Sequence, residues 1–342
     1  MTAKTIALVL GLSVVTQPVQ QRLAYEVADG TLLRRSYSGG IDLEFEGLSS
    51  VVAGQEVPSQ YLPEIEMELV QRFELQIDDH VLRVADGRPT LLERSFEKGA
   101  SSHRRRFSMD GPFVDPMSEE GAWDAESTLE GRVVRFTRID DEDACESEYV
   151  GKEGPPFMLE GLVEDMDWRS MLPEDTEDLE IAVGARWECQ AEAGYALLVP
   201  GGNLHWETPE YVNDDDMLKP IAAVDGGLKA RIVAVDAKQQ RCSIELEGEL
   251  VTKHVAETDL ERIPVADGTA TATTTTTYEL QGLLVWDLEH NHAVSLRAEA
   301  DVQLESLTLK DEGQPGGDFE SSMELRGTWE LAMELVRVDS ED

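Results

Sequence analysis

The chain has 342 residues, with 29 lysines and arginines against 70 aspartates and glutamates, and a formal net charge of −41. This length exceeds the size at which one hydrophobic core stops growing, so two domains are expected, and the 41% hydrophobic content excludes a wholly disordered acidic chain. The strong negative charge repels phosphate backbones and disfavours nucleic acid as a partner.

Residues 1–20 have the features of a secretory signal peptide. Lys4 precedes an uncharged apolar run over residues 6–15, which is too short to cross a bilayer. The alternative is a buried first strand. The following TQPVQQ has no A-x-A site, so the cleavage point stays open. We therefore expect a soluble periplasmic or extracellular protein with no membrane span.

An N-terminal antiparallel β domain is predicted over residues 22–152. Apolar and charged residues alternate from Ile65 to Ile77, which is typical of a strand with one buried face. Residues 99–122 lack this period and are predicted to form an exposed loop. The basic cluster from His103 to Arg106 is expected to compensate the protein's own acidic loops, with docking of an acidic partner as the alternative.

Residues 153–226 are predicted to form a helix-containing connection and the start of a second domain. Helical spacing over 157–166 follows Pro155-Pro156 and predicts one helix of about twelve residues. A shorter helix is predicted over 193–199, before a Pro-Gly-Gly turn. Residues 207–220 are predicted to be a loop.

A five-strand antiparallel meander is predicted over residues 227–338. Between Phe319 and Leu335 the odd positions are mainly apolar and the even ones mainly polar. Such long strands must twist and coil. Glycines on the apolar face of these runs would allow bending or close approach: Gly248, Gly282 and Gly327.

Together these patterns predict a mainly β fold of long, curved antiparallel meander sheets, like a half-barrel, with one or two short helices. Short turn sequences separate the strand patterns. They include Ala28-Asp29-Gly30, Ser38-Gly39-Gly40, Asp78-Asp79, Ala85-Asp86-Gly87, Asp225-Gly226-Gly227, residues 236–239 and His290-Asn291.

Nothing in the sequence predicts a catalytic residue, a metal site or a cofactor. The chain has no nucleophile elbow, no H-E-x-x-H, no P-loop and no dinucleotide-binding glycine motif. The acidic runs 140–143 and 214–216 lack a defined calcium-ligand spacing and are interpreted as solvated acids. His290 and His292 could share a strand face, but they are interpreted as surface histidines of a hairpin turn.

The three cysteines, Cys145, Cys189 and Cys242, have no C-x-x-C spacing. Buried, unreactive thiols are the favoured interpretation, and any disulfide pairing among them stays open. The five threonines from Thr273 to Thr277 favour a plain β-strand.

Three segments carry a resemblance to a known family: residues 81–97, 159–188 and 283–304. They include a V-G-x-x-W step formed by Val183, Gly184 and Trp187, and a W-D-L-E strand from Trp286 to Glu289. In these motifs the chain resembles a family of uncharacterised secreted bacterial all-β proteins without a known activity. The resemblance implies an all-β, secreted protein and assigns no site.

We expect a non-enzymatic protein that binds an apolar or lipid-like ligand on the concave face of the sheet. The second hypothesis is an acidic structural or interaction module of the cell envelope that binds a basic protein or calcium, and the third is a secreted hydrolase. Neither the ligand nor the oligomeric state follows from the sequence. The candidate lining residues are Leu284, Trp286, Leu296, Leu325, Trp329 and Met333.

Overall fold

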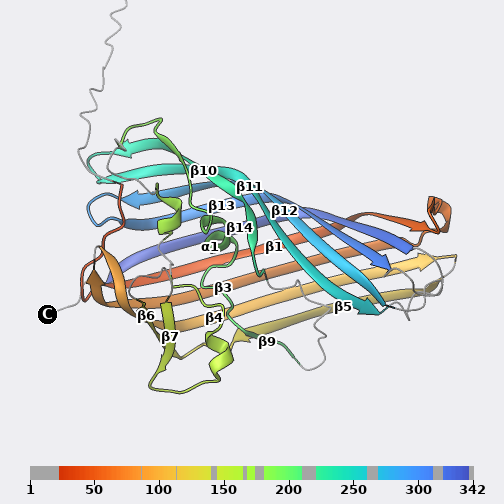
Figure 1. Ribbon diagram of the computed structural model, residues 1–342, viewed down its shortest axis with the longest axis horizontal. Helices are drawn as coiled ribbons and strands as arrows, with labels where there is room; N and C mark the ends of the chain where they lie inside the picture. The colour runs from red at the N-terminus through yellow and green to blue at the C-terminus, as the bar shows by residue number, and fades with distance from the viewer. Residues whose placement is uncertain are drawn as a thin grey trace, which may run out of the picture.

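The computed structural model describes residues 23–85, 87–112, 114–139, 145–164, 168–173, 181–209, 221–259, 269–310 and 319–338. Within these residues, fourteen strands form one antiparallel sheet that does not close on itself (Figure 1). Seven of the strands have 19 to 24 residues each. At about 3.4 Å per residue, strands of this length would extend about 65 to 80 Å. The predicted fold class, long antiparallel strands with few helices, is confirmed.

Eleven of the strands lie side by side in one continuous path. In spatial order they are β7 (Cys145–Val150), β6 (Val133–Arg138), β4 (Arg88–Gly111), β3 (Glu64–Ala85), β1 (Leu32–Val52), β14 (Phe319–Val338), β13 (His292–Lys310), β12 (Thr269–Asp287), β11 (Arg241–Asp259), β10 (Val224–Asp236) and β8 (Arg186–Glu188). Three further strands lie off this path: β2 (Gln55–Glu56), β5 (Val114–Ser127) and β9 (Trp206–Glu207). The helical elements are η1 (Ser59–Tyr61), η2 (Pro156–Leu159), η3 (Arg169–Met171) and α1 (Ala193–Leu198).

The first and last long strands join the two halves of the chain. β1 pairs with β14 from Leu32 opposite Val338 to Val52 opposite Phe319, with one bulge. β1 also pairs with β3 on its other side. Strands from the predicted segments 22–152 and 227–338 therefore share one sheet, and β10 to β14 form its five-strand meander.

Several segments predicted as loops or turns are strands. Residues 99–122 form most of the β4–β5 hairpin, so the predicted exposed loop is wrong. Polar residues such as Ser101 and His103 occupy positions that face the buried side of the sheet, so the alternation of apolar and polar residues is lost in this segment. Backbone pairing with β3 nevertheless continues, because it does not depend on side-chain polarity. The predicted turns Ser38-Gly39-Gly40, Asp78-Asp79 and Asp225-Gly226-Gly227 also lie inside strands.

The helix of about twelve residues predicted after Pro155-Pro156 does not form over the described residues 157–164. Only η2, a single 3-10 turn, follows Pro155, and Gly161 then takes a positive φ of 75°. The next residue, Leu162, makes an isolated bridge to Gly202. The shorter predicted helix is confirmed as α1, of which five residues are buried.

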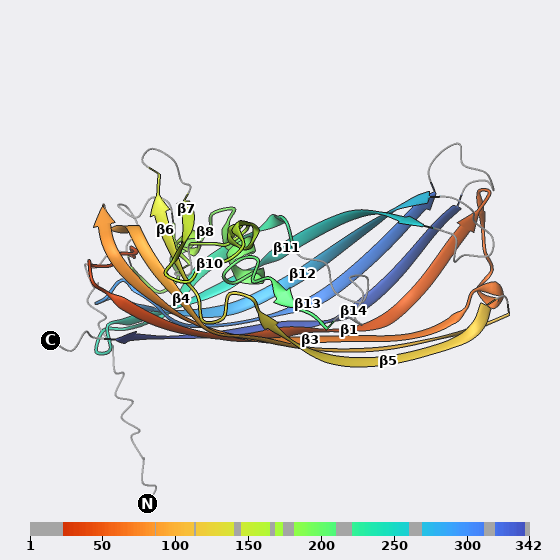
Figure 2. The same cartoon turned by 90° about the horizontal axis from the view of Figure 1, so that it is seen from below.

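The sheet has one apolar face, and α1 packs against it. Figure 2 shows the long strands bending toward the side on which the segment with β6, β7 and β8 stands over one end of the sheet. The contact is close at Gly194, where an added Cβ would lie 2.8 Å from Leu250 Cδ2. At Gly327, on the same face, an added Cβ would lie 1.7 Å from the backbone oxygen of Asp42, so only glycine fits between these strands.

A buried ion cluster interrupts the apolar face at β1, β3 and β4. Arg35 and Arg94 are fully buried, and their side chains meet at the buried carboxylate of Asp79. Arg35 Nη1 donates to Asp79 Oδ2 at 2.7 Å, and Arg94 donates through Nε and Nη2 to the two carboxylate oxygens at 2.7 and 2.9 Å. Burial alone would lower the pKa of Arg94, but the charge and hydrogen bonds of Asp79 outweigh it, so the pKa is raised.

The same cluster ties the connecting segment to the sheet. Arg94 Nη1 donates to the backbone oxygen of Val163 at 2.6 Å, and Nη2 donates to that of Glu164 at 2.8 Å. The Glu164 carboxylate in turn accepts a hydrogen bond from Arg169 at 2.6 Å. Arg94 thus uses its planar fork of donors to join three elements: β3, β4 and the segment before η3.

Replacing Asp79 by Asn should destabilise the protein strongly. Two buried guanidinium groups would lose their counter-charge, and we expect a loss of about 3–5 kcal/mol in the free energy of unfolding. Urea unfolding measures this loss. Asp78→Asn is the matched control, because Asp78 pairs with the solvent-exposed Arg34 and the loss of this pair should cost much less stability. Equal losses in both variants would contradict the role of the buried cluster.

Candidate functional site

The six predicted lining residues are core residues on the apolar face. Their exposed fractions lie between 0% and 6%, and Leu284, Leu296 and Met333 are directly opposed across β12, β13 and β14. They belong to one hydrophobic cluster that also contains α1 residues such as Leu197. None of the six lines either of the two hollows found on the described surface.

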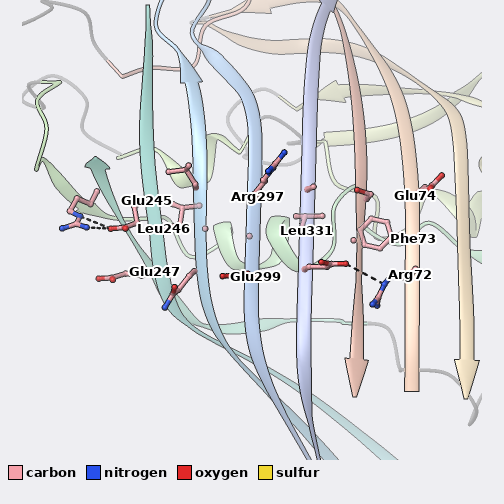
Figure 3. Close-up of a pocket in the computed structure, with 18 residues that line it drawn as sticks. Arg72, Phe73, Glu74, Glu245, Leu246, Glu247, Arg297, Glu299 and Leu331 are labelled. Carbon is pink, nitrogen blue, oxygen red and sulfur yellow. Dashed lines mark hydrogen bonds and ion pairs between the residues drawn. The ribbon is translucent and has the colours of Figure 1, made fainter. Parts of the chain in front are cut away.

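The larger hollow lies on the polar face of the sheet, among its polar side chains, and has a volume of about 920 Å³. Figure 3 shows it across several neighbouring strands, with α1 behind them. Small side chains such as Ser38 and Ala332 leave room at its middle, while long charged side chains surround them. The lining residues are Ser38, Gly39, Arg72, Phe73, Glu74, Arg231, Glu245, Leu246, Glu247, Gln281, Gly282, Leu283, Arg297, Ala298, Glu299, Glu330, Leu331 and Ala332.

Strand register places the charges of this hollow in two adjacent rows. We call the first the arginine row, because it contains three arginines. In order across the strands it consists of Arg186, Arg231, Glu245, Leu283, Arg297, Ala332, Ser38 and Glu74.

The second row, two residues away along each strand, we call the glutamate row. It consists of Glu188, Lys229, Glu247, Gln281, Glu299, Glu330, Gly40 and Arg72. Glu299 and Glu330 are directly opposed in it, and directly opposed like charges destabilise a sheet.

Some of these charges are already paired within the protein. Arg231 Nε donates to Glu245 Oε2 at 3.0 Å, and Arg72 pairs with Asp42 at 2.5 Å and with Glu330 at 3.8 Å. Arg297 is exposed at the middle of the hollow (Figure 3). No carboxylate in the described part of the chain lies within ion-pair distance of its guanidinium, which leaves this cation open to a ligand.

A second hollow of about 350 Å³ continues the first toward β8. It shares Arg231, Glu245 and Glu247 with the larger hollow and adds Arg186 and Lys229, among others. Arg186 lies directly opposite Arg231, so two like charges meet at this end. Sequence reasoning missed both hollows, since it treated the polar face as a solvated or acidic interaction surface and not as the wall of a pocket.

The two turn histidines differ in burial. The side chain of His290 is 40% exposed and its Nδ1 lies 3.2 Å from Asp287 Oδ1, whereas His292 is only 5% exposed. The interpretation as a surface residue is therefore wrong for His292, because it begins β13 on the buried face. Its Nδ1 lies 3.0 Å from the backbone oxygen of Ala293, and burial lowers the pKa of the ring.

The three cysteines are free thiols, and burial makes two of them difficult to deprotonate. Burial raises the pKa of Cys189 and Cys242 to about 12, and it also raises the pKa of Cys145. Thiolates are the reactive form, so these side chains are poor nucleophiles at neutral pH.

Other predicted features divide between described and undescribed residues. Arg104 and Arg106 pair with Glu68, and Arg106 also with Glu120, which fits compensation of the protein's own carboxylates. The threonine run lies in β12, as predicted. The signal peptide 1–20 and the acidic runs 140–143 and 214–216 lie outside the described residues.

The described residues contain no group of three or more His, Cys, Asp or Glu side chains that could hold a metal ion. None of the helices in the described ranges has the length and apolar character needed to span a membrane.

The V-G-x-x-W step has a structural role. Gly184 adopts a φ of 97° and its N–H donates to the backbone oxygen of Ile232, so the step joins β10. Trp187 Nε1 donates to the backbone oxygen of Met171 at 2.8 Å. Membership of the resembling family stays a prediction.

Neither protein-family models nor curated proteins give a match to this chain. Among solved structures, it is similar to an outer membrane channel from Pseudomonas putida F1, with 8% identity, a TM-score of 0.19, and coverage of 92% of this chain and 98% of that one. It is also similar to the outer membrane protein OprG from Pseudomonas aeruginosa, with 6% identity, a TM-score of 0.22, and coverage of 91% and 98%. The P. putida toluene transporter TodX is 9% identical, with a TM-score of 0.16 and coverage of 93% and 94%.

These comparisons correct three predictions. The similar structures are outer membrane proteins, which contradicts the predicted soluble periplasmic or extracellular location and the absence of a membrane among the partners. They also contradict the apolar-ligand carrier and favour neither the acidic, calcium-binding module nor the hydrolase. Two of these proteins are named as a channel and a transporter, and the non-enzymatic role of this chain stays a prediction. At these TM-scores no activity is carried over to this chain.

Three acidic residues form a repulsive ladder beside the glutamate row, and relieving it should stabilise the protein. Glu249, Glu279 and Asp301 are directly opposed across β11, β12 and β13. Glu279→Gln removes two like-charge contacts and should raise the free energy of unfolding by about 0.2–1 kcal/mol per contact at low salt. Chemical unfolding at low and high sodium chloride measures the gain, which salt should reduce.

Glu289→Gln is the control for this ladder. It changes the net charge by the same amount, but Glu289 lies in the turn after β12 and has no directly opposed strand residue. An equal gain in both variants would attribute the effect to net charge alone and contradict the ladder.

His292 should make stability fall as the pH is lowered. The ring is neutral when folded because its pKa is lowered, while the unfolded chain binds a proton near the ordinary pKa of about 6.5. The free energy of unfolding should therefore drop between pH 7.5 and 5.5. Charge on Arg35 and His290 opposes protonation, whereas Asp287 favours it.

Unfolding in urea at both pH values measures the effect. His292→Gln should lose less stability on acidification than the unmodified protein, and His290→Gln should lose about as much. The same pH dependence in His292→Gln would show that another group is responsible.

Proposed function

We propose that this protein binds a polar solute in the larger hollow of its polar face and does so without catalysing a reaction. The observation that carries the proposal is Arg297, an exposed cation at the middle of a hollow of about 920 Å³ with no carboxylate within ion-pair distance among the described residues. A hollow of this size falls within the range of small-molecule sites.

The chemistry of the lining supports a polar solute. Exposed charged side chains such as Glu299, Glu330 and Arg297 line the hollow, and Gln281 adds amide donors and acceptors. Apolar solutes would have to displace water from these charges without replacing their hydrogen bonds, which is unfavourable. The apolar face offers no competing site at the six predicted lining residues, since their side chains are packed.

A binding role needs no reactive group at this hollow. Its lining contains no cysteine and no histidine, so its one serine, Ser38, has no histidine beside it there to act as a base. Nucleophilic catalysis uses an activated nucleophile and a base within hydrogen-bond reach. The lining supplies charge and shape, which are sufficient for recognition.

Filling the hollow should abolish binding. Isothermal titration calorimetry of the full chain with maltotriose, succinate and the dipeptide Ala-Leu, each up to millimolar concentration, should detect at least one solute. Ala332→Trp should weaken that binding by roughly tenfold or more, because the indole would occupy the middle of the hollow.

Val336→Trp is the matched control for this substitution. Val336 lies four residues along β14, is 61% exposed and does not line the hollow, so its replacement should change the affinity by less than about twofold. Binding that survives Ala332→Trp, or no binding of any of the three solutes, would overturn the proposal.

A further inference from the structure

We infer that the solute of the larger hollow is a small zwitterion of peptide-like chemistry, held with its carboxylate on the arginine row and its ammonium group on the glutamate row; this inference rests on the proposed function. The two rows run side by side across the same strands. At the middle of the hollow, Arg297 in the arginine row and Glu299 and Glu330 in the glutamate row present opposite charges, so a ligand with both charges would be oriented by them.

The spacing of the rows fits such a ligand. Arg297 and Glu299 lie on the same face of β13, two residues apart, which corresponds to about 6.8 Å along a strand. Two residues of extended peptide span about 7 Å at most. An extended dipeptide lying along β13 therefore has its two charged ends at the separation of these two side chains.

The carboxylate end has one open cation. Arg297 presents a planar guanidinium that can bind a carboxylate through two parallel hydrogen bonds. Arg231 in the same row is paired with Glu245, so it is a weaker competitor for the ligand.

The ammonium end has two opposed carboxylates. Glu299 and Glu330 are directly opposite each other on β13 and β14, where their charges repel. An ammonium group between them would relieve this repulsion, and Glu330 would share its charge with Arg72, whose Nε lies 3.8 Å away. A doubly negative ligand would gain nothing here, which disfavours a polyanion.

Leu283 adds an apolar contact beside the arginine row. It is 44% exposed although it lies on the polar face, and it is directly opposite Arg297. An apolar side chain of the ligand, next to its carboxylate, would cover the exposed side chain of Leu283. This position suits the C-terminal residue of a dipeptide such as Ala-Leu.

Three related dipeptides test the inference in the full chain. Calorimetry would compare Ala-Leu with N-acetyl-Ala-Leu, which lacks the ammonium group, and with Ala-Leu amide, which lacks the carboxylate. Each modification should weaken binding by roughly tenfold, as expected for the loss of one charged contact.

Variants assign each charge to its row. Arg297→Gln should bind the acid and the amide about equally, and the double variant Glu299→Gln with Glu330→Gln should bind the free and acetylated amines about equally. The control is Glu305→Gln with Glu324→Gln, another directly opposed pair on β13 and β14 that lies outside the hollow. It should keep the discrimination of the unmodified protein.

The outcomes separate this inference from the proposed function. Equal binding of all three dipeptides, or binding of maltotriose or succinate without Ala-Leu, would overturn the zwitterion and leave a polar-solute site standing. Unchanged discrimination in the hollow variants would also overturn it. Absence of binding by every solute would overturn both.

Discussion

The buried contact of two arginines with one aspartate sets the geometry of this protein. Arg35, Asp79 and Arg94 come from three adjacent strands and meet on a face that is otherwise apolar. Charges in such a place are tolerated only when each finds a partner, so the strands must keep their register for the cluster to exist. Because Arg94 also holds the backbone of Val163 and Glu164, the same requirement positions the connecting segment over the sheet.

That arrangement determines which face is available for binding. The connecting segment and α1 cover part of the apolar face, where the hydrophobic cluster is packed. The polar face keeps its charged side chains, and small residues such as Ala332 leave a hollow among them. The residues first expected to line a ligand site thus belong to the core, and the polar face, expected to be a solvated or acidic interaction surface, contains the candidate site.

Period-two alternation predicted the long strands well, because a half-buried antiparallel strand repeats its environment every second residue. It failed where polar residues occupy the inward phase, as Ser101 and His103 do in β4. The ion cluster leaves the same trace: Arg35, Asp79 and Arg94 each stand between two apolar residues of the inward phase. A charged residue at a buried position of each of three strands indicated that the neighbouring strands would supply the opposite charges.

The candidate site could not be predicted in this way. Its two rows of charge combine residues from seven neighbouring strands and the edge strand β8, and they exist only once each register is fixed. A shift of one residue in a single strand would turn that strand's charges to the other face. Hairpin turns constrain successive strands, but no turn joins β1 to β14, so this register was beyond the reach of local sequence.

The pairing of β1 with β14 also affects how the chain can fold. Leu32 finds its partner at Val338, and the loop that this contact closes is nearly as long as the chain. Contacts between residues so distant in sequence are slow to form. On the ribosome, β1 is made before every other described strand, and its second edge is unpaired until β14, the last of them, has been made. A circular permutant that begins within a different hairpin would make these two strands consecutive and shorten that delay.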